Sequence, residues 1–152
     1  MKKFQIALIV IFLFFLVFVS SSLSQSQDIK KLKAGMPNTV TLSNGEVVYD
    51  LNGEWDAIFD NKDLGIDKDV VKITQEGNEF VGIKLIGNIF LGKGRETIKG
   101  ELEGDGFKSL YGYVRTAGGW TRGKGRVSDR GNKIVMEIER YTYTFVLTLT
   151  RK

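Results

Sequence analysis

Residues 141–150 read YTYTFVLTLT, and this stretch decides the fold class. Large side chains at Tyr143, Phe145, Leu147 and Leu149 alternate with threonines at Thr142, Thr144, Thr148 and Thr150. This period of two is typical of a half-buried β-strand, because successive side chains of a strand point to opposite faces of the sheet. Similar short runs fill the chain from Leu51 onward and are separated by Gly, Asn and Asp. The sequence therefore predicts one antiparallel sheet that winds up and down.

The alternating runs predict eight strands, at residues 51–59, 70–75, 79–86, 97–102, 107–115, 120–127, 133–139 and 142–150. Eight strands can close into a barrel whose interior is filled by side chains or holds one small ligand. We therefore expect an all-β fold: an eight-stranded antiparallel up-and-down β-barrel at residues 51–152. A signal peptide and a short N-terminal hairpin are expected to precede it.

The first 24 residues have the pattern of a secretory signal peptide. Lys2 and Lys3 precede an apolar run at residues 6–19, and serines follow at residues 20–22 and 24. The apolar run is shorter than the roughly 20 residues that span a bilayer, which favours a cleaved leader over a membrane anchor. We expect export to the periplasm or the medium, with no integral membrane span after cleavage. Residues 25–50 are predicted to form a linker and a small hairpin that turns at Asn44 and Gly45.

Charge and residue usage exclude several functions. The chain has 22 Lys and Arg against 18 Asp and Glu, and removal of Lys2 and Lys3 (22 − 2 = 20) leaves an excess of only two positive charges. Nucleic-acid binding requires a denser basic footprint, so we expect no nucleic-acid partner. The chain has no Cys and no His, which removes thiolate nucleophiles, imidazole bases and Cys/His metal sites. We expect a monomer without enzymatic activity, metal or cofactor.

Loop lengths predict a closed end and an open mouth. The tight turns at residues 76–78, 104–106 and 129–132 fall at one end of an up-and-down sheet, whereas the connections at 60–69, 87–96 and 116–119 fall at the other. Ligand sites favour the mouths of β-barrels. Candidate mouth or lid residues are Ile89, Phe90, Leu91 and Trp120. The apolar run at residues 89–91 is expected either to cover the lumen or to extend the core.

Two functions remain open. The first is non-catalytic binding of a small apolar or amphipathic ligand, such as a lipid, in the lumen. The second is a structural or interaction module with a filled core, which would contact a cell-envelope partner through its outer face. The candidate lining residues of the lumen are Trp55, Ala57, Phe59, Val71, Ile73, Tyr111, Tyr113, Ile134, Met136, Phe145 and Leu147.

Gly53-Glu54-Trp55 resembles the Gly-x-Trp motif that opens the first strand of calycins, the superfamily of lipocalins, fatty-acid-binding proteins and avidins. The resemblance implies that a basic residue of the last strand packs over this Trp, and Arg151 stands at that place. It therefore assigns Gly53, Trp55 and Arg151 to a structural clamp at the closed end. The chain is also similar to small exported bacterial β-barrel proteins of uncharacterised function.

Two charge clusters each have two interpretations. Basic residues at Arg115, Arg122, Lys124, Arg126, Arg130 and Lys133 indicate either an anionic partner, such as a lipid headgroup or an envelope polymer, or a solvated face. Acidic residues at Asp60, Asp63, Asp67 and Asp69 fit no calcium-loop spacing, and we expect a solvated turn there.

Overall fold

The computed structural model describes residues 29–62, 65–88, 91–114, 118–140 and 143–152. The predicted signal peptide lies outside the described residues. Eleven strands and one short 3-10 helix make up the described secondary structure. They are β1 (Thr39–Thr41), β2 (Val47–Tyr49), β3 (Gly53–Asn61), β4 (Gly65–Glu76), β5 (Glu79–Lys84), β6 (Glu96–Glu103), β7 (Gly106–Val114), β8 (Gly119–Arg122), β9 (Lys124–Ser128), η3 (Asp129–Gly131), β10 (Lys133–Arg140) and β11 (Tyr143–Arg151).

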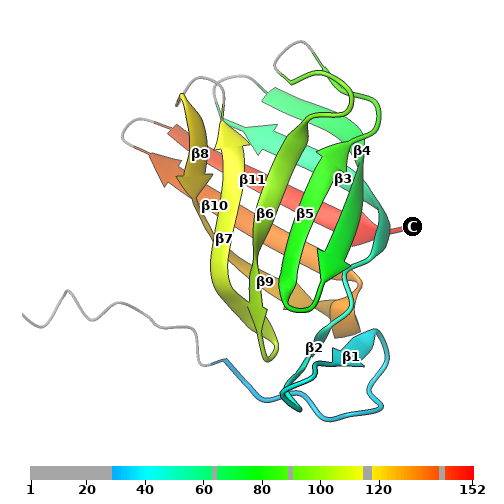
Figure 1. Ribbon diagram of the computed structural model, residues 1–152. Helices are drawn as coiled ribbons and strands as arrows, with labels where there is room; N and C mark the ends of the chain where they lie inside the picture. Colours follow the sequence, from blue (N-terminus) through cyan, green and yellow to red (C-terminus); the bar gives the residue numbers. More distant parts are fainter. Residues whose placement is uncertain (1–28, 63–64, 89–90, 115–117, 141–142) are drawn as a thin grey trace, which may run out of the picture.

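The predicted all-β fold is confirmed, as an antiparallel sheet of nine strands that curls into a nearly closed barrel (Figure 1). The strand order is β8-β7-β6-β5-β4-β3-β11-β10-β9, so every neighbour except the pair β3 and β11 is also a neighbour in sequence. The last strand returns to the first, with Leu149 opposite Ala57 and Arg151 opposite Trp55. This is the up-and-down arrangement that the alternating runs predict.

The strand count differs from the prediction at Gly123. The predicted strand at residues 120–127 is divided into β8, which pairs with β7, and β9, which pairs with β10. The amide of Gly123 donates a hydrogen bond to the carbonyl of Leu110 at 2.9 Å, which holds the bend against β7. A Cβ at residue 123 would lie 2.5 Å from Cε of Met136, so the bend brings the backbone too close to the core for a side chain.

The closed end of the barrel is covered by the N-terminal segment. The predicted hairpin is present as β1 and β2, and it lies below the barrel in Figure 1. Val48 and Leu51 are fully buried against the barrel core. The amide and carbonyl of Lys30 bond to Asp105 in the β6–β7 turn, at 2.7 and 3.0 Å. Residues 29–51 therefore pack as part of the same hydrophobic unit as the barrel.

The loop between the first two barrel strands is much shorter than the sequence suggests. Residues 60–69 were expected to form a connection, but β3 continues to Asn61 and β4 begins at Gly65. Asp67 and Asp69 consequently lie in a strand opposite Phe59 and Ala57. The predicted solvated acidic turn is wrong at these two positions, because strand alternation directs both side chains toward the barrel interior.

Candidate functional site

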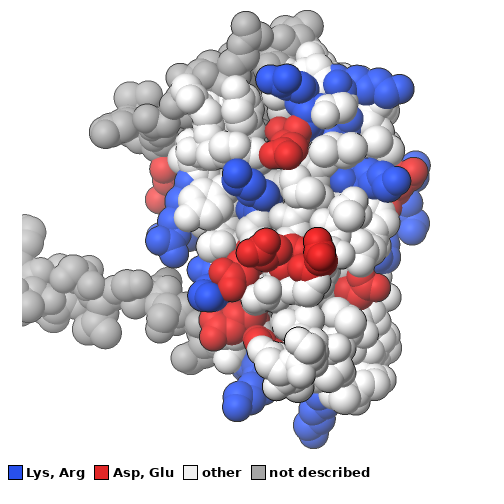
Figure 2. All heavy atoms as spheres, viewed as in Figure 1, with Lys and Arg blue, Asp and Glu red and all other residues white. Residues whose placement is uncertain are grey.

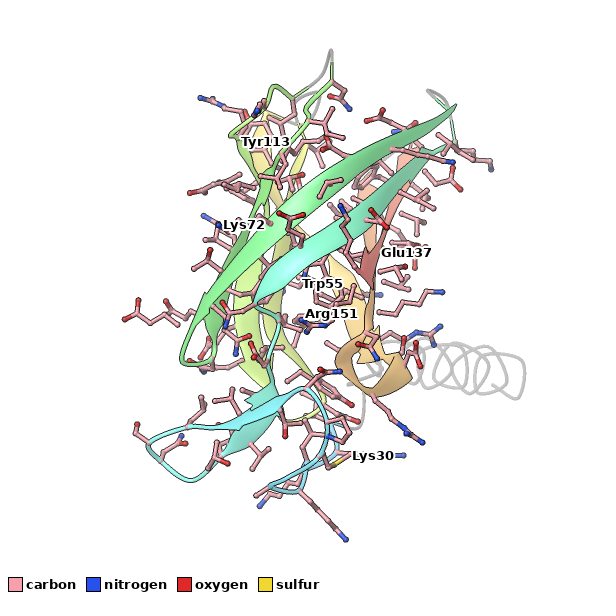
Figure 3. All side chains as sticks on the ribbon, turned by 90° about the vertical axis from the view of Figure 1, so that its right-hand side faces the viewer. Lys30, Trp55, Lys72, Tyr113, Glu137 and Arg151 are labelled. Atoms are coloured by element: carbon pink, nitrogen blue, oxygen red, sulfur yellow. The ribbon has the colours of Figure 1, made fainter. Side chains whose placement is uncertain are left out.

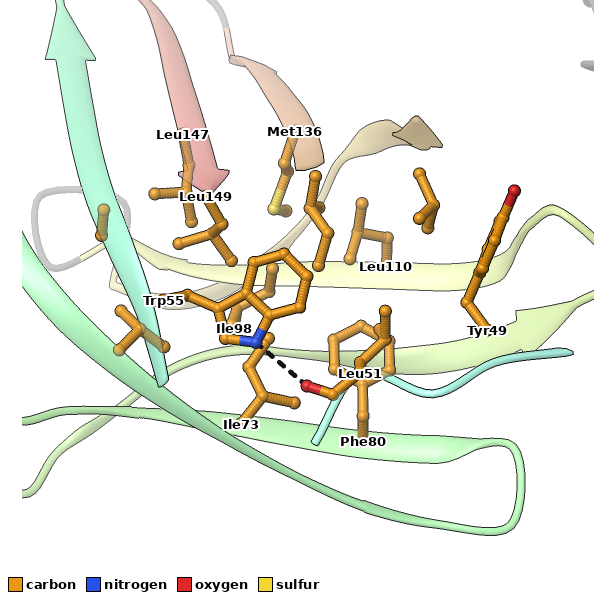
Figure 4. Close-up of a cluster of buried hydrophobic side chains, with 14 of the residues drawn as sticks. Tyr49, Leu51, Trp55, Ile73, Phe80, Ile98, Leu110, Met136, Leu147 and Leu149 are labelled. Atoms are coloured by element: carbon orange, nitrogen blue, oxygen red, sulfur yellow. Dashed lines mark hydrogen bonds between the residues drawn. The ribbon is translucent and has the colours of Figure 1, made fainter. Parts of the chain in front are cut away.

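Most of the predicted lumen residues do face the interior. Trp55, Ala57, Phe59, Val71, Ile73, Ile134, Met136 and Leu147 belong to one buried hydrophobic cluster, and Phe145 packs against it. Figure 4 shows side chains from several strands converging around Trp55. The predicted lining is therefore largely a packed core in the described part of the chain.

The prediction that Tyr111 and Tyr113 line the lumen is wrong, because both residues lie on the outer face of β7. The residue between them, Gly112, faces inward: a Cβ there would lie 2.5 Å from Cδ1 of Ile138 and 3.1 Å from Cε of Met136. Alternation along the strand then turns both tyrosines outward. Sequence alone did not separate the two faces of β7, because both carry large side chains.

Inward glycines show how tightly the strands pack. The side chains of Ile98 and Val71 pack directly against Gly82. If residue 82 had a Cβ, it would lie 2.6 Å from Cγ2 of Ile98 and 2.8 Å from Cγ1 of Val71. Gly125 leaves similar room for Leu110, at 2.3 Å. Because neighbouring side chains already occupy the space that a methyl group would need, the interior around these positions is filled.

The predicted contact between Arg151 and Trp55 is present at the closed end. The guanidinium carbon of Arg151 lies 4.6 Å from the centre of the Trp55 ring, and Figure 3 shows the two residues side by side. Arg151 also donates to the carbonyl oxygens of Asn52, at 2.8 Å, and Asp50. Nε1 of Trp55 donates to the carbonyl of Leu51 at 3.0 Å, the dashed line in Figure 4. Gly53 has a φ of 128°, and a Cβ there would lie 3.6 Å from the Arg151 guanidinium.

A buried charged cluster near the mouth was missed by the sequence analysis. The ammonium of Lys84 lies 3.1 Å from Asp69, and the two side chains are 2% and 0% exposed. The same ammonium lies 3.7 Å from Asp67 and 4.2 Å from the centre of the Phe59 ring. One signal could have found it: Lys84 continues the inward series Phe80–Gly82, and Asp69 continues the inward series Ile73–Val71.

Asp69 holds the start of the β5–β6 connection. Its carboxylate accepts backbone hydrogen bonds from Val70 at 2.7 Å, Ile86 at 3.1 Å and Gly87 at 3.0 Å. Lys84 supplies the neutralising charge. The carboxylate therefore binds three backbone amides and one ammonium. These contacts fix the start of the β5–β6 connection, so the Lys84–Asp69 pair is a structural element of the mouth.

The predicted lid is only partly within the described residues. Ile89 and Phe90 lie outside them. Leu91 is half-buried, and its backbone amide donates a hydrogen bond to Oδ1 of Asn88 at 2.8 Å. Trp120, the other predicted mouth residue, is half-buried and packs on the outward-facing Tyr113 of the neighbouring strand.

The outer face of β6, β7 and β8 carries a group of aromatic and basic side chains. We call Lys99, Tyr111, Tyr113, Trp120 and Arg122 the β6–β8 patch. The rings of Tyr113 and Trp120 meet edge to face, with centroids 5.7 Å apart and planes at 86°. The ammonium of Lys99 lies 4.2 Å from the centre of the Trp120 ring. Cross-strand pairing places Tyr111 between Lys99 and Arg122 in a single row.

Acidic side chains occupy a different part of this face. Figure 2 shows a band of Asp and Glu across the middle of the visible face, with most of the Lys and Arg above it and a further acidic group among them. On β6, Glu101 is engaged by Lys108 at 2.8 Å and by Asn78 at 3.0 Å. The hydrogen bond from Lys108 lowers the pKa of the Glu101 carboxyl, and the same bond raises the pKa of Lys108. The nearest outward acid along β6 therefore does not pair with Lys99.

Within the described ranges, no group of three or more acidic side chains is arranged to hold a metal ion. The same part of the chain contains no helix that is long and apolar enough to cross a membrane.

Comparisons with known proteins give no family for this chain. No protein-family model matches the chain, and no curated protein matches it. Among solved structures, the chain is similar to a redesigned β-barrel, with 13% sequence identity and a TM-score of 0.45. That similarity covers 67% of this chain and 91% of the redesigned barrel. The class of protein that the strand topology defines is a nearly closed antiparallel β-barrel.

Proposed function

We propose that this protein is a non-catalytic interaction module, which has a filled barrel interior and contacts a cell-envelope partner through the β6–β8 patch. The observation that carries the proposal is the contrast between its two faces. The inner face consists of buried side chains packed against glycines such as Gly82 and Gly112. The outer face presents a partly exposed ring pair, Tyr113 and Trp120, beside the exposed Arg122.

Half-buried aromatic side chains are suited to this role. Tyr and Trp combine a large apolar surface with a polar group, and both residues and Arg are enriched where proteins bind partners. None of the five patch residues forms an ion pair with another described residue. The positive charges of Arg122, which is exposed, and of Lys99, which contacts the Trp120 ring, can therefore bind an external anionic group.

Export and calycin membership are parts of the proposal. The leader expected at residues 1–24 would deliver the barrel to the cell envelope or beyond it. The calycin resemblance is supported by the contact of Arg151 with Trp55 and by the pairing of the last strand with the first.

The test is co-sedimentation of the purified protein with insoluble envelope material of the organism that produces it. We expect the wild-type protein to sediment with this material and the variants Trp120→Ala and Arg122→Ala to remain in the supernatant. Lys72→Ala is the matched control, because Lys72 is an exposed outward residue on β4, away from the patch. The proposal would be refuted if all four proteins sediment to the same extent, or if none of them sediments with the envelope material.

Lumenal binding of a small amphipathic ligand is the second candidate. It is favoured by the mouth, where Phe59 and Phe145 lie 5.7 Å apart and the side chain of Asp67 is 38% exposed. Native mass spectrometry of protein purified from its exporting host distinguishes the two. A copurified mass of lipid size would favour the lumen, and a clean apoprotein mass would favour the module.

A further inference from the structure

We propose that the row Lys99–Tyr111–Arg122 binds the carboxylate groups of an acidic polysaccharide that lies along the outer face of β8 and β9. This inference rests on the proposed function and names the class of partner. Its starting point is the cross-strand register, which pairs Lys99 with Tyr111 and Tyr111 with Arg122.

The row has the chemistry of a carboxylate site. Adjacent strands lie about 4.8 Å apart, so three successive positions present an ammonium, a phenol hydroxyl and a guanidinium over roughly 10 Å. All three groups can donate hydrogen bonds, and the planar guanidinium matches both oxygens of a carboxylate. Glu101, the next outward residue on β6, is already paired with Lys108 at 2.8 Å. Because neither Lys99 nor Arg122 is in an ion pair with another described residue, the row is a concentration of available donors.

The neighbouring strand indicates a polymer instead of a single small anion. Gly123 and Gly125 face the core, where an added Cβ would meet Met136 and Leu110. Alternation then directs four consecutive outward positions away from the core, and these are Trp120, Arg122, Lys124 and Arg126. Arg122, Lys124 and Arg126 are exposed. Outward positions of a strand recur about every 6.6–6.8 Å, so Lys124 and Arg126 of β9 extend the positive charge of Arg122 beyond the bend at Gly123, for a chain with repeated negative charges.

Two exposed acids of β10, Glu137 and Glu139, moderate this line. Glu137 of β10 stands opposite Lys124 in the β9–β10 pairing. Arg126 stands opposite the uncharged Val135, and Arg122 stands opposite Tyr111. Arg122 of β8 and Arg126 of β9 are therefore the principal charges here, and guanidinium groups suit carboxylates better than ammonium groups do.

A polysaccharide fits the aromatic pair better than a nucleic acid does. Single-stranded nucleic acids bind by stacking bases on open ring faces, but the ammonium of Lys99 lies over the face of Trp120 at 4.2 Å. The overall charge is also nearly balanced, with 22 basic against 18 acidic residues. An acidic polysaccharide does not need to stack on these rings, because its repeated carboxylates supply the negative charges that the row binds.

The direct test is isothermal titration of the full-length protein with polygalacturonate, a soluble polyuronate. Neutral dextran and an oligodeoxythymidylate of matched charge serve as comparison polymers. We expect polygalacturonate to bind, dextran not to bind, and the oligonucleotide to bind at least tenfold more weakly. Arg122→Gln and Lys99→Gln should each weaken polyuronate binding about tenfold, because each loses charge-assisted hydrogen bonds to a carboxylate. Lys72→Gln should leave it unchanged.

Different results separate this inference from the proposed function. Envelope co-sedimentation without polyuronate binding would overturn the polysaccharide and leave the interaction module. Failure of both assays would overturn both. Oligonucleotide binding as tight as polyuronate binding would assign the row to nucleic acid, and unchanged binding in Arg122→Gln and Lys99→Gln would show that polyuronate binds elsewhere. Thermal unfolding of each variant confirms that a loss of binding is not a loss of fold.

Discussion

The ammonium of Lys84 and the carboxylate of Asp69 form an ion pair of 3.1 Å inside the barrel, where their side chains are 2% and 0% exposed. The two residues come from adjacent strands, β5 and β4. A buried ion pair stabilises a protein little relative to an apolar pair, but loss of one partner leaves an uncompensated charge. The two partners are unequal here, because only Asp69 also accepts hydrogen bonds from the amides of Val70, Ile86 and Gly87.

Asp69→Ala should therefore destabilise the protein more than Lys84→Met. The first change leaves a buried ammonium and three backbone amides without their partner, and we expect a loss of about 3–5 kcal/mol. The second leaves a carboxylate that keeps its three amide donors, so the loss should be smaller. Urea unfolding measures both. Asp67→Asn is the control, since Asp67 is 38% exposed and lies 3.7 Å from Lys84, and it should cost about 1 kcal/mol or less. The reverse order of Asp69→Ala and Lys84→Met would contradict this account.

A filled interior predicts that Gly112→Ala is destabilising. The added methyl group would lie 2.5 Å from Cδ1 of Ile138, so we expect a loss of about 1–3 kcal/mol from overpacking. Combination with Ile138→Val removes the crowding atom and should recover part of the loss. Gly92→Ala is the matched control, because nothing lies within 4 Å of a Cβ at that position. Chemical denaturation of the four proteins measures the differences, and a neutral Gly112→Ala would mean that the interior has room to spare.

Alkaline stability should depend on Tyr49, which is buried where the N-terminal segment meets the barrel. Burial, and secondly the negative charge of Asp105, raises the pKa of the Tyr49 phenol above its usual 10.0. A group whose pKa is raised in the folded state contributes stability that is complete below pH 10 and is lost as pH rises toward the folded-state pKa. Tyr49→Phe should lessen this loss above pH 10. Urea midpoints at pH 8 and pH 11 test it, and an equal decline in both proteins would rule out Tyr49 as the cause.

The strands were predictable because alternation is a local property. Each predicted run corresponds to a strand of the sheet, with the division at Gly123 as the exception. That division depends on Met136, which is close in space but distant in sequence. The predicted orientation of β7 was wrong for a similar reason. Tyr111 and Leu110 are both large, and only the closeness of Gly112 to Ile138 shows which face is inside.

The charged cluster was hidden by the assumption that acidic residues near a turn are solvated. Asp69 is buried because β4 begins at Gly65, and its burial is tolerable because Lys84 and the amides of Val70, Ile86 and Gly87 are its partners. Alternation places both residues on the inner face, but which inward residues meet across the β4–β5 hairpin depends on the register of the two strands. The β6–β8 patch was likewise divided by the sequence analysis, which placed Tyr111 and Trp120 at the lumen and the mouth. Cross-strand register brings these residues together on the outer face.

The closed end should owe much of its stability to Trp55 and Arg151. Trp55→Ala removes a fully buried ring, and we expect a loss of about 3–5 kcal/mol. Arg151→Ala removes a cation–π contact worth about 0.5–2 kcal/mol together with hydrogen bonds to the carbonyls of Asn52 and Asp50. Lys152→Ala is the control, because its pair with Glu54 at 3.6 Å is exposed. In urea unfolding, Arg151→Ala should be clearly less stable than Lys152→Ala and should lose less than Trp55→Ala. If Trp55→Ala unfolds near the wild-type midpoint, the two residues do not act as a clamp.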